Sequence, residues 1–171
     1  MGEPRLLDSL EDALPRLPRS ALPGPRLRLA TGTDGTLAAY DRYGTGDILV
    51  FDPAADLLLA SVAPVDRVTS LGVIVPTPGG VWVSGQRANG QDAVAYSAYD
   101  GATMVLDPCQ AIPGACFGTL EAATEDAAWI SAWPYDRDSY EVDLMAARIR
   151  RYENGVPVPA LDVSGSELFE P

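Results

Sequence analysis

With 171 residues and an apolar share of 47%, the chain is long enough for one domain with a sizeable core, and its composition argues against global disorder. Its net charge of −12 arises from 24 acidic residues and 12 arginines, and a body this acidic would repel phosphates, which disfavours nucleic-acid binding. Histidine and lysine do not occur, so Ser-His-Asp or Cys-His catalysis, Schiff-base lysines and histidine metal ligands are excluded.

The first 25 residues are predicted to form a short helix followed by a proline-rich linker. Residues 5–14 place apolar side chains at helical spacing, namely Leu6, Leu7, Leu10, Ala13 and Leu14. Four prolines between Pro15 and Pro25 then favour an extended linker. The helix is expected to be a frayed terminus or a cap on the body, with docking to a partner as the alternative. The longest apolar runs have the length of a strand, so a membrane span is not expected. The first thirty residues lack the apolar stretch of a secretory signal, which leaves two alternatives: a cytoplasmic protein, or an exported one whose signal is not part of this sequence.

From Arg26 to the end, short runs rich in Val, Ile, Leu, Tyr and Thr alternate with Gly, Pro and Asp turns, which predicts β-strands. Three segments align: TDGTLAA from Thr33, TPGGVWV from Thr77 and TEDAAWI from Thr124, at spacings of 44 and 47 residues. Trp82 and Trp129 occupy the same repeat position, which is Ala38 in the first copy.

A second set of similar segments follows in the same phase. Each has a strand, an aromatic residue, an acid, a tight turn and a returning strand, with the aromatic–acid pairs Phe51-Asp52, Tyr99-Asp100 and Tyr152-Glu153. A period near 45 residues with four strands per unit is typical of propeller blades. The sequence therefore predicts an all-β, β-propeller-like array of about three four-stranded blades, with repeats at 26–67, 68–115 and 116–163 within a domain of 26–171.

The motif G-G-V-W-V (79–83), followed by an aromatic–acid turn, resembles the blades of YVTN-type and pyrroloquinoline-quinone-type propellers, including relatives of streptogramin lyases. The resemblance covers about 26–163 and implies radial sheets around a central channel, but no particular activity. Three blades form an incomplete ring, because a closed ring needs four or more. A protein partner, self-association or membership of a longer protein is therefore expected, with closure as a sandwich or barrel as the alternative.

Two cysteines, Cys109 and Cys116, flank the Pro113-Gly114 turn and are predicted to form a loop-closing disulfide. Such a short loop would contribute roughly 2–3 kcal/mol in the chain-entropy model. A disulfide favours a secreted or cell-envelope protein. Two free thiols in a cytoplasmic protein remain the alternative.

Several carboxylates recur in the loops at 41–47, 86–92 and 134–143, which share one repeat position. The candidates for a Ca²⁺ site are Asp41, Asp47, Asp92, Asp136 and Asp138, since oxygen ligands suit this ion. The EF-hand spacing is missing, so solvated hairpin loops are the preferred interpretation and no cofactor is predicted.

Aromatic residues fall into two groups. Those at regular repeat positions are predicted to pack between blades: Trp82, Trp129, Phe51, Tyr99 and Tyr152. Trp133 and Tyr135 lie outside that register and, with Arg137 and Arg87, are the candidates for binding a partner.

The leading hypothesis is a non-catalytic interaction or recognition module that uses its loop face. One alternative is a fragment of a propeller enzyme, such as a glycoside hydrolase using two carboxylates. Another is a structural subunit that completes a ring by self-assembly. The histidine base on which streptogramin lyases rely is missing, so lyase activity is not expected.

Overall fold

The computed structural model describes residues 27–41, 47–63, 65, 68, 70–87, 89–110, 112–139, 141–159 and 163–164. Within these ranges the secondary structure is β-strand and turn, with no α-helix. The same part of the chain accordingly offers no helical segment suited to spanning a membrane. The helix predicted at 5–14 lies outside the described residues.

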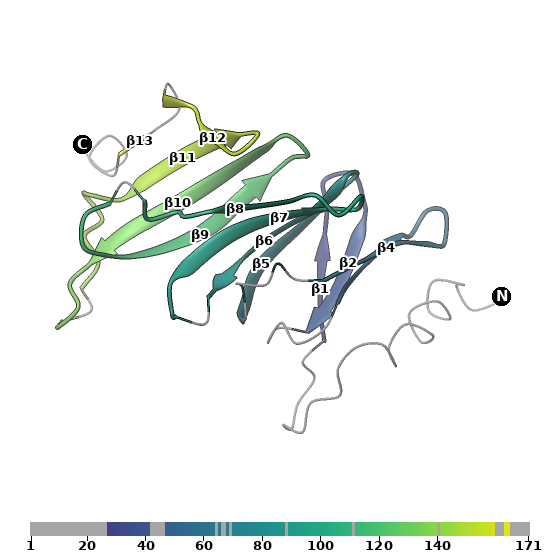
Figure 1. Ribbon diagram of the computed structural model, residues 1–171, viewed down its shortest axis with the longest axis horizontal. Coiled ribbons are helices and arrows are strands. Elements are labelled where there is room, and N and C mark those ends of the chain that lie inside the picture. Colours follow the sequence, from purple (N-terminus) through teal and green to yellow (C-terminus); the bar gives the residue numbers. More distant parts are fainter. Residues whose placement is uncertain are drawn as a thin grey trace.

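Three antiparallel sheets follow one another along the chain, and each is built from consecutive strands (Figure 1). Sheet 1 contains β1 (Leu27–Thr31), β2 (Leu37–Asp41), β3 (Ile48–Asp52) and β4 (Leu57–Val62). Sheet 2 contains β5 (Ser70–Thr77), β6 (Gly80–Gln86), β7 (Asp92–Ala98) and β8 (Thr103–Leu106). Sheet 3 contains β9 (Ala115–Ala123), β10 (Ala127–Tyr135), β11 (Arg148–Glu153) and β12 (Val156–Pro157), with β13 (Val163–Ser164) also paired to β11. The all-β prediction is thus confirmed, as three sheets of four or five strands.

Tight turns let consecutive strands pair directly. Asn154 and Gly155 join β11 to β12, and both have positive φ (46° and 79°), as a two-residue hairpin turn with the right twist requires. Gly101 adopts the positive φ (94°) in the turn between β7 and β8. In the same turn the Asp100 side chain accepts a hydrogen bond from the Ala102 N–H at 3.0 Å. The turn residues therefore set the meander order of each sheet.

Each sheet has two faces, because successive side chains of a strand point to opposite sides. We call the face of sheets 1 and 2 that is turned toward the next sheet along the chain the forward face, and the opposite one the back face. In sheet 3 the back face is turned toward sheet 2, and the forward face is turned away from it. The core between sheets 1 and 2 is mainly aliphatic, with one buried tyrosine, and includes Ala38, Tyr40, Ile48, Val50, Ile74, Val81, Val83 and Ala95. The core between sheets 2 and 3 contains Trp82, Val94, Leu106, Leu120, Ala128, Ile130 and Tyr152.

Side-chain hydrogen bonds connect sheets 2 and 3. The indole Nε1–H of Trp82 donates to the carbonyl oxygen of Thr124 at 2.9 Å, and the hydroxyls of Ser84 and Thr119 lie 3.1 Å apart. Trp82 is 2% exposed, so its one polar group is satisfied inside the interface. The predicted packing of Trp82 between units is therefore observed.

The tryptophan of sheet 3 lies in a different environment from the one predicted for it. Trp129 is only partly buried on the forward face, between Ala122 and Arg151 in the strand register, and the Arg151 guanidinium carbon lies 5.1 Å from the ring centroid. Trp129 thus does not pack between two sheets, because no described sheet follows sheet 3 on that side.

The other three aromatic residues of this group also differ in their surroundings. Tyr152 is buried between sheets 2 and 3, and Tyr99 packs at the border of the core between sheets 1 and 2. Phe51 is buried on the back face of sheet 1, where no described sheet precedes it. Phe51 pairs with Leu37 in sheet 1, and the equivalent pair in sheet 2 is Ser97 with Val81. Ser97 is therefore the counterpart of Phe51, and Tyr99 lies two residues beyond the position that the repeat alignment assigned to it.

Candidate functional site

The connection between β8 and β9 is closed by the predicted disulfide. Cys109 and Cys116 are bonded, with their Cα atoms 5.8 Å apart. The carboxylate of Asp107 accepts a hydrogen bond from the Cys109 N–H at 2.9 Å. Gly118 in β9 leaves room for Pro108, whose ring would contact any Cβ at that position. The disulfide loop (residues 107–116) is therefore held at both ends.

A pocket of about 530 Å³ lies against this loop. Its walls come from residues 89–92 of the β6–β7 loop, from six residues of the disulfide loop, and from Tyr135 and Arg137 at the end of β10. These three segments come from two different sheets and the connection between them. The volume lies in the range common for ligand sites in proteins.

The pocket wall is rich in hydrogen-bonding groups. Asn89, Gln91 and Gln110 contribute amides, Asp92 and Asp107 contribute carboxylates, and Arg137 contributes a guanidinium.

Some of these groups already hold the wall together. The Asp92 carboxylate accepts from the Gly118 N–H at 2.7 Å, which joins β7 to β9, and the Asn89 amide donates to Gln91 Oε1 at 2.8 Å. The carboxylates and the Asn89–Gln91 pair therefore hold the wall of the site, and Gln110 and Arg137 line it as further hydrogen-bonding groups.

An aromatic pair forms the edge of the site. The rings of Tyr135 and Phe117 stack with centroids 4.1 Å apart and an interplanar angle of 15°. Phe117 is 38% exposed, and its register partner in β10 is Trp133. Partly exposed aromatic residues beside polar groups are enriched at recognition surfaces.

Two of the four residues predicted to bind a partner, Tyr135 and Arg137, line the pocket. Trp133 lies next to it on β10, partly exposed. Arg87 begins the β6–β7 loop and supports its shape, since its backbone N–H donates to Gln91 O at 2.7 Å and its carbonyl accepts from Gly90 N at 2.9 Å. Its side chain does not line the pocket, and its buried Nε has no hydrogen-bond partner among the described atoms.

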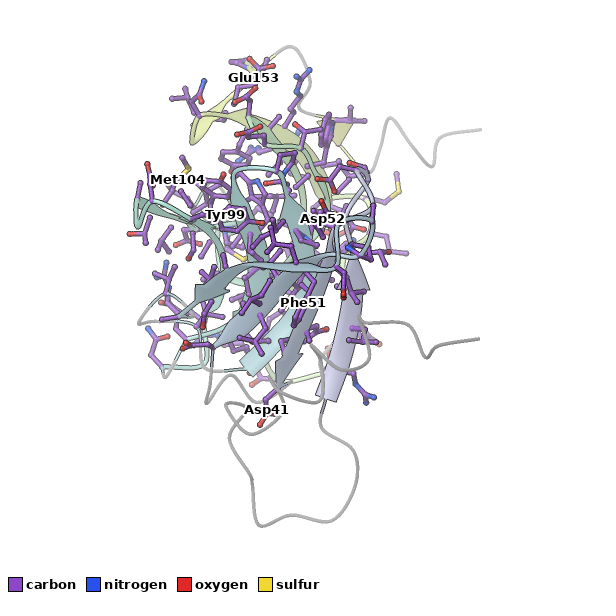
Figure 2. All side chains as sticks on the ribbon, turned by 90° about the vertical axis from the view of Figure 1, so that its right-hand side faces the viewer. Asp41, Phe51, Asp52, Tyr99, Met104 and Glu153 are labelled. Atoms are coloured by element: carbon purple, nitrogen blue, oxygen red, sulfur yellow. A yellow bond between two sulfur atoms is a disulfide. The ribbon has the colours of Figure 1, made fainter. Side chains whose placement is uncertain are left out.

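The carboxylates named as candidates for a Ca²⁺ site do not gather in one cluster. Asp41 is buried at the end of β2, and Figure 2 shows it at the edge of the molecule opposite Asp52 and Tyr99. Asp47 accepts a hydrogen bond from the Ser61 hydroxyl at 2.6 Å. Across the described ranges, no group of three or more His, Cys, Asp or Glu residues is close enough to hold a metal ion.

Asp136 closes its own turn. Hydrogen bonds donated by the backbone N–H groups of Ser139 and Asp138 lower the pKa of the Asp136 carboxyl below its ordinary value. Asp138 is exposed in the same turn. The Asp136 carboxylate therefore stabilises the backbone of its own turn, as Asp side chains in turns commonly do.

Sequence reasoning named the loop at 86–92, which contributes Asn89, as a possible binding face, but it missed the pocket residues contributed by the disulfide loop. The cysteine pair was the available signal, because a closed loop between two units presents its polar residues at a defined place. Comparisons with known proteins add no further residue: no family model, no curated protein and no solved structure matches the chain.

Proposed function

We propose that the protein is a non-catalytic recognition module that binds a partner protein through the pocket at the disulfide loop. The observation that carries this proposal is the convergence of three separate segments, one of them closed by a disulfide, around a polar cavity of about 530 Å³. A wall held by a covalent link and by the Asp92–Gly118 hydrogen bond loses little conformational freedom when a ligand binds.

The partner surface that best fits the pocket is a polar, extended peptide segment. Gln110 can pair with backbone N–H and C=O groups, because an amide side chain both donates and accepts. Arg137 and Tyr135 are residue types that carry much of the binding energy in protein interfaces. The absence of histidine and lysine from the sequence argues against the commonest acid–base and nucleophilic chemistry at this site.

We further propose that the three sheets are blades of a propeller-like array. The positions of equivalent residues support this. Ala38 in β2, Trp82 in β6 and Trp129 in β10 share one repeat position, and each lies on the forward face of its sheet. Phe51 and Tyr152, which share another repeat position, lie on back faces. The first strands β1, β5 and β9 also lie beside one another in turn, as inner strands of successive blades do. Gly32 closely approaches the Pro76 carbonyl, and Gly79 similarly approaches Glu125, one sheet further.

The disulfide supports a location outside the cytoplasm, because such bonds persist in oxidising compartments. Mass measurement of the protein from its native cells, after alkylation without reductant, tests this. Protein that carries no alkyl group on Cys109 or Cys116 is expected. Full alkylation of both residues would contradict export.

Selection from a displayed peptide library against the folded chain tests the binding function. Selected peptides are expected to lose at least about tenfold in affinity, or about 1.4 kcal/mol, on the Tyr135→Ala and Arg137→Ala variants. Arg28→Ala, an exposed arginine on β1 far from the pocket in sequence, is the matched control and should bind like the wild type. Peptides that bind all variants equally, measured by calorimetry, would contradict the proposed site.

Screening against glycosides tests the non-catalytic part of the proposal. No turnover is expected. Turnover that disappears in the Asp136→Asn and Asp138→Asn variants would identify a carboxylate-based hydrolase instead.

A further inference from the structure

The back face of sheet 1 carries an apolar cluster that is separate from the cores between the sheets. Ala39, Leu49 and Phe51 form it, with Leu37 and Leu58 packed against them. In the strands they alternate with Ala38 and Val50, which face sheet 2, so the cluster faces away from sheet 2. Figure 2 views the molecule from this end, with Phe51 on sheet 1.

Phe51 and its neighbours are nevertheless shielded from solvent. Ala39, Leu49 and Phe51 are 0%, 1% and 0% exposed. All residues described as packing in this cluster belong to sheet 1 itself. Leu29, on the edge strand β1, is 56% exposed, so the shielding is centred on β2 and β3. A sheet face of this kind needs a covering element, because side chains of a single sheet layer cannot bury one another.

We propose that residues 5–14 dock on the back face of sheet 1 and cap it in place of a preceding blade. This segment places Leu6, Leu7, Leu10, Ala13 and Leu14 at helical spacing, so it has one apolar stripe to bury. A helix of this length would measure about 15 Å, enough to cover three strands about 4.8 Å apart.

The length of the connection fits this assignment. The chain enters sheet 1 at Leu27, so residues 15–26 form the link, and they can span up to about 40 Å. The acids of the segment, Asp8, Glu11 and Asp12, lie outside its apolar stripe and leave that stripe free to face the sheet.

Other parts of the chain fit the face less well. Residues 42–46 (RYGTG) contain one bulky apolar group, and residues 165–171 follow β13 of sheet 3, which is separated from sheet 1 by sheet 2. The cap would leave one open end of the array, the forward face of sheet 3. It would thereby prevent head-to-tail chains of molecules, which arise when two complementary faces are both free.

A spin label in the full chain tests the docking without disturbing the sheet. Both native cysteines are in the disulfide, so Ser9→Cys creates one reactive thiol for a nitroxide. The methyl signals of Leu49 and Leu58 are expected to lose most of their intensity, while those of Leu120 and Ile130 in sheet 3 keep theirs. Unchanged signals from Leu49 and Leu58 would overturn the proposal.

Leu10→Asp in the labelled chain is expected to restore these signals and to increase binding of a hydrophobic dye, because the apolar stripe is broken. Leu17→Asp, the same change in the linker, is the matched control and should leave both readouts unchanged. A second experiment separates docking within one molecule from docking by a second copy. Spin-labelled chain without isotope enrichment is mixed with isotope-enriched chain that carries no spin label. Broadening in the mixture would show that a second copy covers the face, contrary to the proposal.

Discussion

Trp82 and Trp129 occupy the same place in two successive sheets, yet their surroundings differ. Trp82 lies between Val75 and Tyr96 in the register, is 2% exposed and donates its indole N–H to Thr124 of sheet 3. Trp129 lies between Ala122 and Arg151, partly exposed, with the arginine over its ring. The residue type is the same and the position in the strand is the same, so the difference comes from the neighbouring sheet.

The residues that face the two rings across the neighbouring strand also differ. Where sheet 2 has Tyr96 beside Trp82, sheet 3 has Arg151 beside Trp129. An arginine can cover an aromatic ring with its guanidinium and still reach water, which suits a solvated face. The partly exposed surroundings of Trp129 are therefore matched by its cross-strand partner, Arg151, although the tryptophan itself repeats.

The largest effect is expected from Trp82→Ala. Removing a buried indole from the interface between sheets 2 and 3 should lower the free energy of unfolding by about 3–5 kcal/mol. Urea unfolding followed by circular dichroism measures it. A loss no greater than that of Trp129→Ala would break the comparison, because it would mean that the two rings contribute alike.

Trp82→Phe separates the hydrogen bond from the buried volume. Phe retains most of the ring but leaves the Thr124 carbonyl without its donor, so a loss of about 1–2 kcal/mol is expected by the same measurement. Trp129→Phe serves as the matched control and should be nearly neutral. If both substitutions cost the same, the hydrogen bond to Thr124 contributes nothing measurable.

Tyr99 extends the comparison to the interface between sheets 1 and 2. Burial raises the pKa of Tyr99 to about 12, with the Asp34 carboxylate adding to the shift, and its hydroxyl donates to the Thr77 carbonyl at 2.7 Å. The raised folded-state pKa means that stability is fully present below pH 10 and is lost as the pH rises from about 10 to 12.

Thermal melting between pH 9 and 12 measures this loss. The Tyr99→Phe variant should show a shallower decline than the wild type, after allowance for the other tyrosines. Parallel declines in the two proteins would indicate that Tyr99 does not ionise with the shifted value.

The smallest effect is expected from Trp129→Ala. Its partly exposed ring contributes a cation–π contact with Arg151, worth about 0.5–1 kcal/mol at such a site. Arg151→Ala should cost a similar amount, and the double variant should cost less than the sum, because both changes remove one contact. A loss above 2 kcal/mol for Trp129→Ala would point to a second molecule packed on the forward face of sheet 3.

Local patterns were sufficient to predict the strands, their turns and the cysteine pair. Strands such as β6 and β7 were recognisable from alternating small and apolar residues between Gly and Asp turns. The Cys109–Cys116 bond followed from two cysteines close in sequence around a turn. These features depend on contacts between residues near one another in the chain.

Part of the proposed site was named from the sequence. Tyr135 was chosen because it lies outside the repeat register, and both it and the candidate Arg137 line the pocket, as does Asn89 of the loop at 86–92. Gln110 was not named, since a pocket wall depends on how loops of different sheets come together. Among the candidate Ca²⁺ carboxylates, for which solvated hairpin loops were the preferred interpretation, Asp47 and Asp136 pair with a nearby hydroxyl and a backbone N–H group.

The sequence by itself determined that this protein is built from three consecutive antiparallel sheets, because strand alternation and turn chemistry act over a few residues. Only the tertiary structure decided which faces are covered. Whether Trp82, Trp129 or Phe51 meets water depends on what lies about 10 Å away across a sheet face. The contacts across that distance join residues far apart in the chain, such as Trp82 and Thr124, which are 42 positions apart. The same strand pattern therefore yields a core in sheet 2 and an open surface in sheet 3.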